Sequence, residues 1–122
     1  MSLNFLKIIR EAKMKYDKIF LYGTGKYAQG MEKYLESIDD CLINGFVISD
    51  GEHLDKRFIQ GKVVLHLSEV PYQGCCFILS LHKKYHDEII ENLKSKSYSH
   101  IICFEDMDFD NIINADNIIK MG

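Results

Sequence analysis

The stretch from Lys18 to Ala28 constrains the fold of this chain more than any other part of the sequence. It opens with the apolar run 19–22, whose β-branched and aromatic residues are typical of a buried strand. The run stops at Gly23, and apolar residues at three- and four-residue steps follow at once, which indicates an amphipathic helix. The sequence therefore predicts a buried strand that passes through a tight turn directly into a helix.

The turn has the form G-x-G-x-x-A, the glycine/alanine version of the dinucleotide-binding turn. Gly23 permits a tight exit from the strand, and Gly25 lets the backbone approach a phosphate without an intervening Cβ. Ala28 lets the helix pack closely on the strand. The amides of this segment point outward at the positive end of the helix dipole, where an anion is stabilised. The predicted phosphate-binding residues are Gly23, Thr24, Gly25, Lys26, Tyr27 and Ala28.

The rest of the chain continues the alternation of strand and helix. Apolar runs predict further strands over residues 45–50, 62–65, 75–79 and 100–104. Apolar stripes at helical spacing predict helices over 4–15, 27–38, 87–96 and 110–121. Residues 51–61 are polar with glycine at both ends, and we expect a mobile loop there.

This alternation implies right-handed crossovers and a parallel sheet. We expect a single Rossmann-like α/β domain over residues 1–122, with its core over 18–104. Its sheet is predicted to have five parallel strands in the order 3-2-1-4-5, with helices on both faces. The N-terminal helix over 4–15 is an addition to this core, and the helix over 110–121 closes the domain.

In that strand order the ligand crevice lies over the carboxyl ends of the first and fourth strands, where the order reverses. The glycine turn then lies beside Ser80, Leu81 and His82, which follow the fourth predicted strand. We expect these three residues to line the crevice. His82 has a side chain suited to general acid–base catalysis, but an isolated loop histidine is equally a polar lining residue, and no catalytic residue is assigned.

Asp50 closes the second predicted strand, somewhat farther from Gly23 than the usual separation of about 20 residues. A carboxylate there accepts both ribose hydroxyls of a nucleotide and repels a 2′-phosphate. Asp50 therefore favours NAD-type or UDP-type ligands over NADP. An aspartate in a solvated loop has the same sequence signature, so this reading stays open as well.

Composition limits the class of protein. The chain has 122 residues, of which 47% are hydrophobic, and a net charge of −3, so it suits one globular domain. The negative charge argues against nucleic acid or an anionic membrane surface as the main partner. No apolar run approaches the roughly 18 residues of a membrane span, and the N-terminus lacks the apolar region of a signal peptide. We expect a cytoplasmic location.

The cysteines and the other metal-like patterns do not predict a site. The four cysteines lie in or beside apolar runs, so we expect reduced thiols and no disulfide. Cys76, His82 and His86 have a zinc-like spacing, but Cys76 falls inside a strand and no fourth ligand is evident. The aspartates of 106–110 lack the glycine and glutamate of a calcium loop. We expect no metal, and the glycine turn is not that of a Walker-type ATPase.

Four segments together carry a family resemblance: 20–25 (Phe-Leu-Tyr-Gly-Thr-Gly), 45–50 (Gly-Phe-Val-Ile-Ser-Asp), 61–64 (Gly-Lys-Val-Val) and 77–80 (Phe-Ile-Leu-Ser), the last followed by a helix with Glu88-Ile89-Ile90 and Leu93. Residues 19–104 resemble the small Rossmann domains at the N-termini of bacterial sugar acetyltransferases and of other surface-polysaccharide biosynthesis proteins. In that family the domain binds a nucleotide or nucleotide sugar, and a partner domain performs the chemistry. The resemblance extends to the glycines and Asp50. The sequence differs from that family in that no hexapeptide repeats and no methyl- or glycosyl-transfer segment follow. We therefore expect that this chain does not itself catalyse the reaction.

Three functions of different class remain. The first is a nucleotide- or nucleotide-sugar-binding module that acts with a separate catalytic partner or as a homo-oligomer. The second is an NAD-dependent oxidoreductase, or a fragment of one, acting on a sugar nucleotide. Hydride transfer needs a substrate wall opposite the nicotinamide, and 122 residues barely complete the cofactor half, which favours the module. The third is a degenerate Rossmann scaffold whose crevice is empty.

Overall fold

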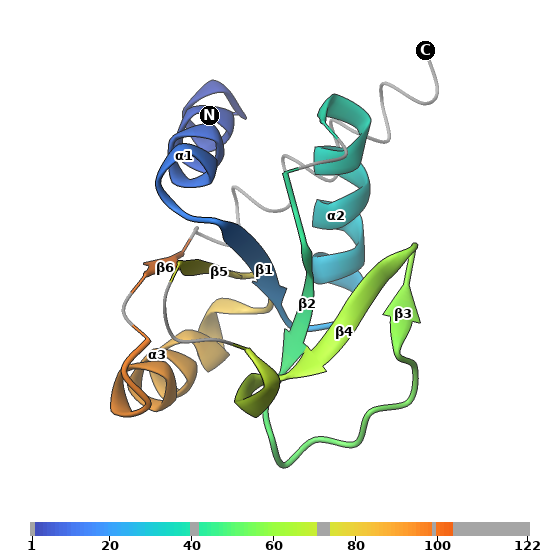
Figure 1. Ribbon diagram of the computed structural model, residues 1–122, viewed down its shortest axis with the longest axis vertical. Helices are drawn as coiled ribbons and strands as arrows, with labels where there is room; N and C mark the ends of the chain where they lie inside the picture. The colour runs from blue at the N-terminus through green and yellow to red at the C-terminus, as the bar shows by residue number, and fades with distance from the viewer. Residues whose placement is uncertain (1, 40–41, 71–73, 99, 104–122) are drawn as a thin grey trace.

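The computed structural model of the chain describes residues 2–39, 42–70, 74–98 and 100–103 (Figure 1). Within them the helices are α1 (Ser2–Lys15), α2 (Lys26–Ile38) and α3 (His86–Ser95), and none of these is long and apolar enough to cross a membrane. The strands are β1 (Lys18–Tyr22), β2 (Gly45–Ile48), β3 (Phe58–Ile59), β4 (Lys62–His66), β5 (Cys75–Leu79) and β6 (Ile101–Ile102). Two 3-10 turns, η1 (Leu67–Glu69) and η2 (Lys83–Tyr85), complete the described elements.

The strands form one sheet in the order β3-β4-β2-β1-β5-β6. β1 lies inside this sheet, parallel to β2 on one side and to β5 on the other, so that Phe20 pairs with both Gly45 and Phe77. The pairs β2–β4 and β5–β6 are parallel as well. The predicted mixed α/β class with a mainly parallel sheet is confirmed.

The predicted number of strands is wrong, because the sheet has six strands rather than five. Residues 58–59, expected to be loop, form β3 antiparallel to β4. The two residues that join these strands, Gln60 and Gly61, both have positive φ, at 53° and 80°. Two successive left-handed residues make the tight turn that suits a β-hairpin, and this turn brings the loop back along β4. The helix predicted over 110–121 lies outside the described residues.

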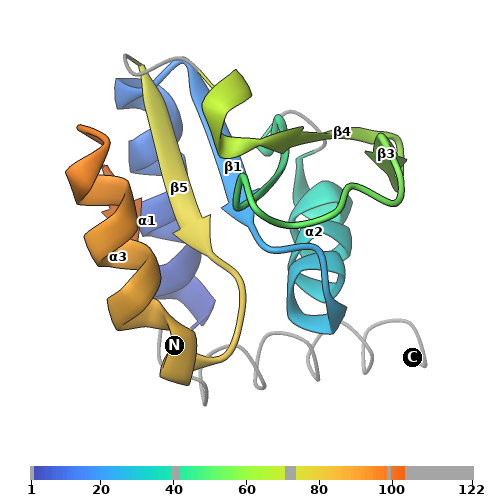
Figure 2. The ribbon, with the colours of Figure 1, turned by 90° about the horizontal axis from the view of Figure 1, so that it is seen from below.

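Two apolar cores lie on opposite faces of the sheet, because successive strand residues point to opposite sides. Leu21 of β1 packs in one core with Ile9 of α1 and Met31 of α2. The next residue, Tyr22, packs in the other core with Leu93 of α3. Figure 2 shows α2 and α3 on opposite sides of β1 and β5. Helices therefore cover both faces, and α1 covers part of the face that it shares with α2.

The thiols of β5 belong to these cores. Cys75 and Cys76 are buried free cysteines, whereas Cys103 is a free cysteine at an exposed position. Burial raises the pKa of the Cys76 thiol to about 11, so the group is protonated at neutral pH. Cys41 lies outside the described residues.

Glu32 is a carboxyl group on the buried face of α2. Its side chain is 0% exposed, and neither carboxyl oxygen has a hydrogen-bond partner among the described residues. Burial raises the pKa of the Glu32 carboxyl to about 7, and the Glu36 carboxyl one helical turn away adds to the rise. The folded protein therefore keeps a proton on Glu32 to a pH at which an exposed glutamate has lost it.

Candidate functional site

The first glycine of the turn occupies a position that only glycine suits. Gly23 has a φ of +116°, and its amide donates a 2.8 Å hydrogen bond to the carbonyl oxygen of Val47 at the end of β2. An added Cβ would lie 3.2 Å from Cδ2 of Leu81 and 3.3 Å from the carbonyl oxygen of Ser80. The turn after β1 is thus held against the end of β2 and against the segment that follows β5.

The second glycine differs, because it adjoins open space. Gly25 is the N-cap residue of α2, with an ordinary φ of −81°, and no atom lies within 4 Å of an added Cβ. No side chain caps the helix here, and its first turn has no acidic residue. The first amides of any helix lack an acceptor within the helix and stand at its positive end. The N-terminus of α2 therefore presents donors toward an open position.

The other residues of the turn support this arrangement in different ways. Gln29 donates from its side-chain Nε2 to the carbonyl oxygen of Thr24 at 2.8 Å, and from its amide to that of Gly25 at 3.0 Å. Lys26 is exposed at the first position of α2, and Tyr27 is half-buried against the core. Ala28 is 0% exposed beneath the helix, where a small residue allows close packing on the sheet.

Two cavities flank the turn at the carboxyl edge of the sheet. The α2-side cavity, of about 440 Å³, is lined by Thr24, Gln29 and residues of the 52–60 loop. The α3-side cavity, of about 670 Å³, is lined by Gly23, Leu81 and residues of α3. Ile48 and Glu52 line both cavities. The glycine turn therefore opens onto a hollow on each side.

The α3-side cavity is lined by a pair of hydroxyl groups and by carboxylates. The hydroxyls of Tyr22 and Ser49 lie 2.6 Å apart, and burial raises the pKa of the Tyr22 phenol, with the charge of Glu52 adding to the rise. Glu52, Glu88 and Glu91 also line this cavity, and none of its described lining residues is lysine, arginine or histidine. Such a surface accepts hydrogen bonds from hydroxyl groups and is unfavourable for phosphate.

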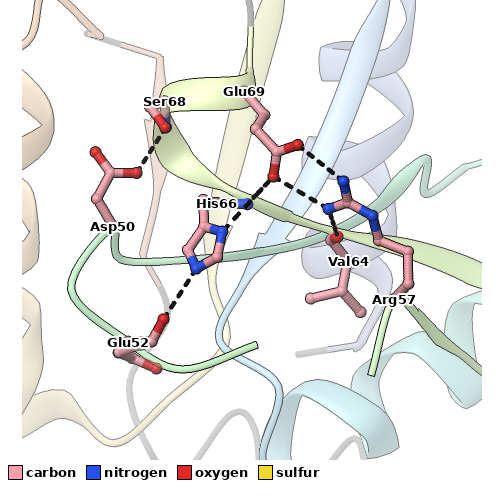
Figure 3. A network of polar contacts seen from close by, with 7 residues as sticks. All are labelled: Asp50, Glu52, Arg57, Val64, His66, Ser68 and Glu69. Carbon is pink, nitrogen blue, oxygen red and sulfur yellow. Dashed lines mark hydrogen bonds and ion pairs between the residues drawn. The ribbon is translucent and has the colours of Figure 1, made fainter. Parts of the chain in front are cut away.

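Asp50 is not part of either cavity. Its Oδ1 accepts a 2.8 Å hydrogen bond from the amide of Ser68 in η1, and its Oδ2 lies 3.0 Å from Nζ of Lys96 after α3. These two contacts, the amide first, lower the pKa of the Asp50 carboxyl. Figure 3 shows the carboxylate directed toward Ser68. The structure thus brings the predicted ribose carboxylate to η1 and α3 rather than to the glycine turn.

Of the three residues predicted after β5, Leu81 lines the α3-side cavity, whereas Ser80 and His82 line neither of the two cavities beside the turn. Ser80 is 1% exposed, and its hydroxyl donates a 3.0 Å hydrogen bond to the carbonyl oxygen of Tyr22. The exposed His82 accepts a 3.1 Å hydrogen bond at Nδ1 from the amide of Lys84, which caps η2. Ser80 is therefore a structural link between β5 and β1, and His82 shapes the lead into α3.

The zinc-like residues are not assembled into a site. Cys76 is 1% exposed inside β5, and His86 donates from Nε2 to the carbonyl oxygen of Leu81 at 3.0 Å. No cluster of three potential metal-ligating side chains occurs within the described residues.

The 51–61 loop is held by a polar network that the sequence did not reveal (Figure 3). Arg57 donates two hydrogen bonds to the Glu69 carboxylate, at 3.0 and 3.1 Å, and a third to the carbonyl oxygen of Val64 at 3.1 Å. Arg57, followed by the amide of His66, lowers the pKa of the Glu69 carboxyl to about 2. His66 in turn donates from Nε2 to the carbonyl oxygen of Glu52 at 2.9 Å. The loop is therefore tied to β4 and η1.

Glu52 is the site residue that sequence reasoning missed. It lies in a run of charged residues that is typical of a solvated loop, and its neighbours at the cavities come from distant elements that include β1, β2, β4, α2 and α3. The sequence signal that could have identified Glu52 is a carboxylate shortly after the second strand. Asp50 has the same signal, so the sequence does not distinguish the two residues.

In comparisons with known proteins, no family model matches the chain, and neither a curated protein nor a solved structure matches it with significance. The resemblance to the small Rossmann domains of sugar acetyltransferases therefore stays a prediction. The geometry of the turn and of its two cavities carries the functional argument.

Proposed function

We propose that this chain is a nucleotide-binding module that holds NAD or a nucleotide sugar. The diphosphate lies at the N-terminus of α2, over Gly23 to Ala28, and the two ends of the ligand occupy the α2-side and α3-side cavities. The module lacks complete catalytic machinery of its own.

The observation that carries this proposal is the open position at Gly25. The positive φ of Gly23 and the closeness of Leu81 to its missing Cβ both require a glycine at this position, whether or not a ligand binds. Gly25 has an ordinary φ and nothing near its missing Cβ, so neither strain nor packing explains it. A phosphate approaching the uncapped amides of α2 does explain it, because a Cβ there would stand in its path.

The charges around the turn agree with this placement of the ligand. The acid-lined α3-side cavity disfavours phosphate and suits a neutral, hydroxyl-bearing group such as a sugar or ribose. The positive end of α2 and the exposed Lys26 favour phosphate instead. A nucleotide diphosphate carries both kinds of group in a single molecule.

The family resemblance supplies the wider proposal. We propose that the module serves bacterial polysaccharide or sugar biosynthesis in the cytoplasm, and that a separate catalytic partner or a homo-oligomer completes the active unit. Nothing in the proposal calls for a metal.

Titration of NAD, NADP, UDP-glucose and coenzyme A against the purified chain, by calorimetry, tests the proposal. We expect Gly25→Ala to weaken binding of the nucleotide by about tenfold or more, which is about 1.4 kcal/mol. Gly51→Ala is the matched control, because Gly51 also has nothing within 4 Å of an added Cβ and no left-handed φ. Both variants should fold, Gly51→Ala with the stability of the parent and Gly25→Ala with a slightly lower one, because alanine is less favourable than glycine at an N-cap.

Equal affinity of the parent and Gly25→Ala would show that the turn is structural only. If no nucleotide binds the parent at millimolar concentration, the proposal fails and the empty scaffold takes its place.

A further inference from the structure

Glu52 stands between the two cavities that flank the glycine turn. It lines both of them, whereas Asp55 lines only the α2-side cavity, and Glu88 and Glu91 line only the α3-side cavity. Thr24 shares the first cavity with Glu52, and Gly23 shares the second. Glu52 thus adjoins both cavities beside the turn.

The backbone of Glu52 is fixed on both sides while its side chain is exposed. Its amide donates a 3.0 Å hydrogen bond to the carbonyl oxygen of Ser49, and its own carbonyl oxygen accepts the 2.9 Å hydrogen bond from His66 (Figure 3). The Glu52 carboxylate has no hydrogen bond or ion pair to any described residue, in contrast to the carbonyl beside it. Glu52 and Tyr22 line the same α3-side cavity, and after burial the charge of Glu52 adds to the raised pKa of the Tyr22 phenol.

The carboxylate of Asp50, unlike that of Glu52, is bound to other residues of the chain. One carboxylate oxygen is occupied by the Ser68 amide and the other by Lys96, and the residue lines neither cavity. Asp50 is therefore bound to η1 and to the end of α3, outside both cavities beside the turn.

We infer that Glu52, rather than Asp50, is the residue that accepts hydrogen bonds from the ribose hydroxyls of the bound nucleotide and repels a 2′-phosphate. This inference rests on the proposed function, because it assumes a nucleotide whose phosphates lie at the N-terminus of α2. The physical basis is that a carboxylate accepts hydrogen bonds from both hydroxyls of a ribose, and that two negative charges in one partly desolvated cavity repel each other.

The test compares two charge-neutralising variants, Glu52→Gln and Asp50→Asn, with Glu11→Gln, at an exposed position of α1 outside both cavities, as a control for the change in net charge. Dissociation constants are measured for NAD against NADP, and for UDP against 2′-deoxy-UDP, by calorimetry. Each ligand pair differs only at the 2′ position, so the ratio of the two constants isolates the contact at that position.

We expect the parent chain to prefer NAD over NADP, or UDP over its 2′-deoxy form, by about tenfold. Glu52→Gln should reduce that ratio to about threefold or less, because the amide keeps the shape of the side chain but loses its charge. Asp50→Asn and Glu11→Gln should leave the ratio unchanged, because neither residue lines a cavity beside the turn. Both Glu52 and Asp50 are exposed, so the variants should fold.

The inference is overturned if Asp50→Asn changes the ratio and Glu52→Gln does not, or if the parent shows no preference at the 2′ position. In both cases nucleotides bind, and the proposed function stands. If Gly25→Ala binds nucleotide as well as the parent does, or if no nucleotide binds, the proposed function itself fails and the inference fails with it.

Discussion

The main-chain amide of Ser68 donates a 2.8 Å hydrogen bond to Oδ1 of Asp50, across 18 residues of sequence. This bond and the contact with Lys96 join the loop after β2 to η1 and to the end of α3. They give Asp50 a structural role, and that role has a measurable consequence for stability.

We expect Asp50→Ala to lower the free energy of unfolding at neutral pH by about 1 kcal/mol, since it removes one charge-assisted backbone bond and one exposed ion pair. Asp50→Asn should cost less, because its side-chain oxygen still accepts from Ser68. The folded pKa of Asp50 is lowered, so this stabilisation is complete above the ordinary pKa and is lost as pH falls through the folded pKa. Urea unfolding at neutral and strongly acidic pH measures it. A loss from Asp50→Ala that persists in acid would contradict the assignment.

Gly45 supports a prediction about the sheet. An added Cβ there would lie 2.6 Å from the carbonyl oxygen of Val63 and 2.9 Å from its Cγ1, in the β2–β4 pair. We expect Gly45→Ala to destabilise the fold by about 1–3 kcal/mol, because the backbone of β4 has to move. Gly51→Ala makes the same chemical change at an open position, so it controls for the effect of alanine on the unfolded chain. Similar denaturation midpoints for the two variants would contradict this prediction.

Glu32 should make stability fall as pH rises. Between about 4.5, its ordinary pKa, and about 7 the unfolded chain releases the proton that the folded chain keeps. The folded state binds more protons in this window, so the free energy of unfolding decreases by up to about 1.4 kcal/mol per pH unit and levels off above it.

Glu32→Gln should remove that dependence, so its stability relative to the parent should increase from about pH 5 to about pH 8. Glu11→Gln, at an exposed position of α1, is the control and should leave the slope unchanged. Denaturant unfolding across this pH range makes the comparison. If the free energies of unfolding of the parent and of Glu32→Gln change with pH in parallel, Glu32 is ionised in the folded state across this range.

Tyr98 makes a buried hydrogen bond that can be tested by removing one atom. Its hydroxyl donates to the carbonyl oxygens of Val70 and Leu67. Its ring packs edge-on against the ring of Phe77, with 5.1 Å between the two ring centroids. We expect Tyr98→Phe to cost about 1–2 kcal/mol, since it keeps the packing and removes the tyrosine donor from the Val70 carbonyl. The Leu67 carbonyl still accepts a 3.0 Å hydrogen bond from the amide of Val70. Tyr85→Phe, at a half-exposed ring, should cost almost nothing. An unchanged stability of Tyr98→Phe would mean that another donor satisfies the Val70 carbonyl.

The glycine turn was predictable because every signal for it is local. A buried strand, a glycine that needs positive φ and a small residue beneath the helix all fall within the stretch from Lys18 to Ala28. Ala28, Met31 and Leu35 are buried as the helical stripe predicts. Glu32 lies on the same stripe, one turn from Ala28, and is buried like the apolar residues beside it. Its position on the helix indicates this burial, but glutamate is usually an exposed residue, so the sequence did not predict it.

The rest of the site depends on contacts between distant segments. Asp50 lies beyond the last residue of β2, so its direction is set by Ser68 and Lys96 rather than by strand alternation. β3 has only two residues and exists because the Gln60–Gly61 turn pairs it with β4. Neither the hairpin nor the polar network that holds Glu52 has a periodic signal in the sequence.

The position of β1 inside the sheet also has a consequence for the order of assembly. β1, β2, β3 and β4 all come from residues 18–66, whereas the other neighbour of β1 is Cys75–Leu79. A nascent chain that has emerged only as far as His66 therefore carries β1 as an unprotected edge, with a row of free backbone donors and acceptors. Arrival of β5 closes that edge. We expect ribosome-bound chains stalled before Cys75 to aggregate, and those stalled after the sheet is complete to remain dispersed.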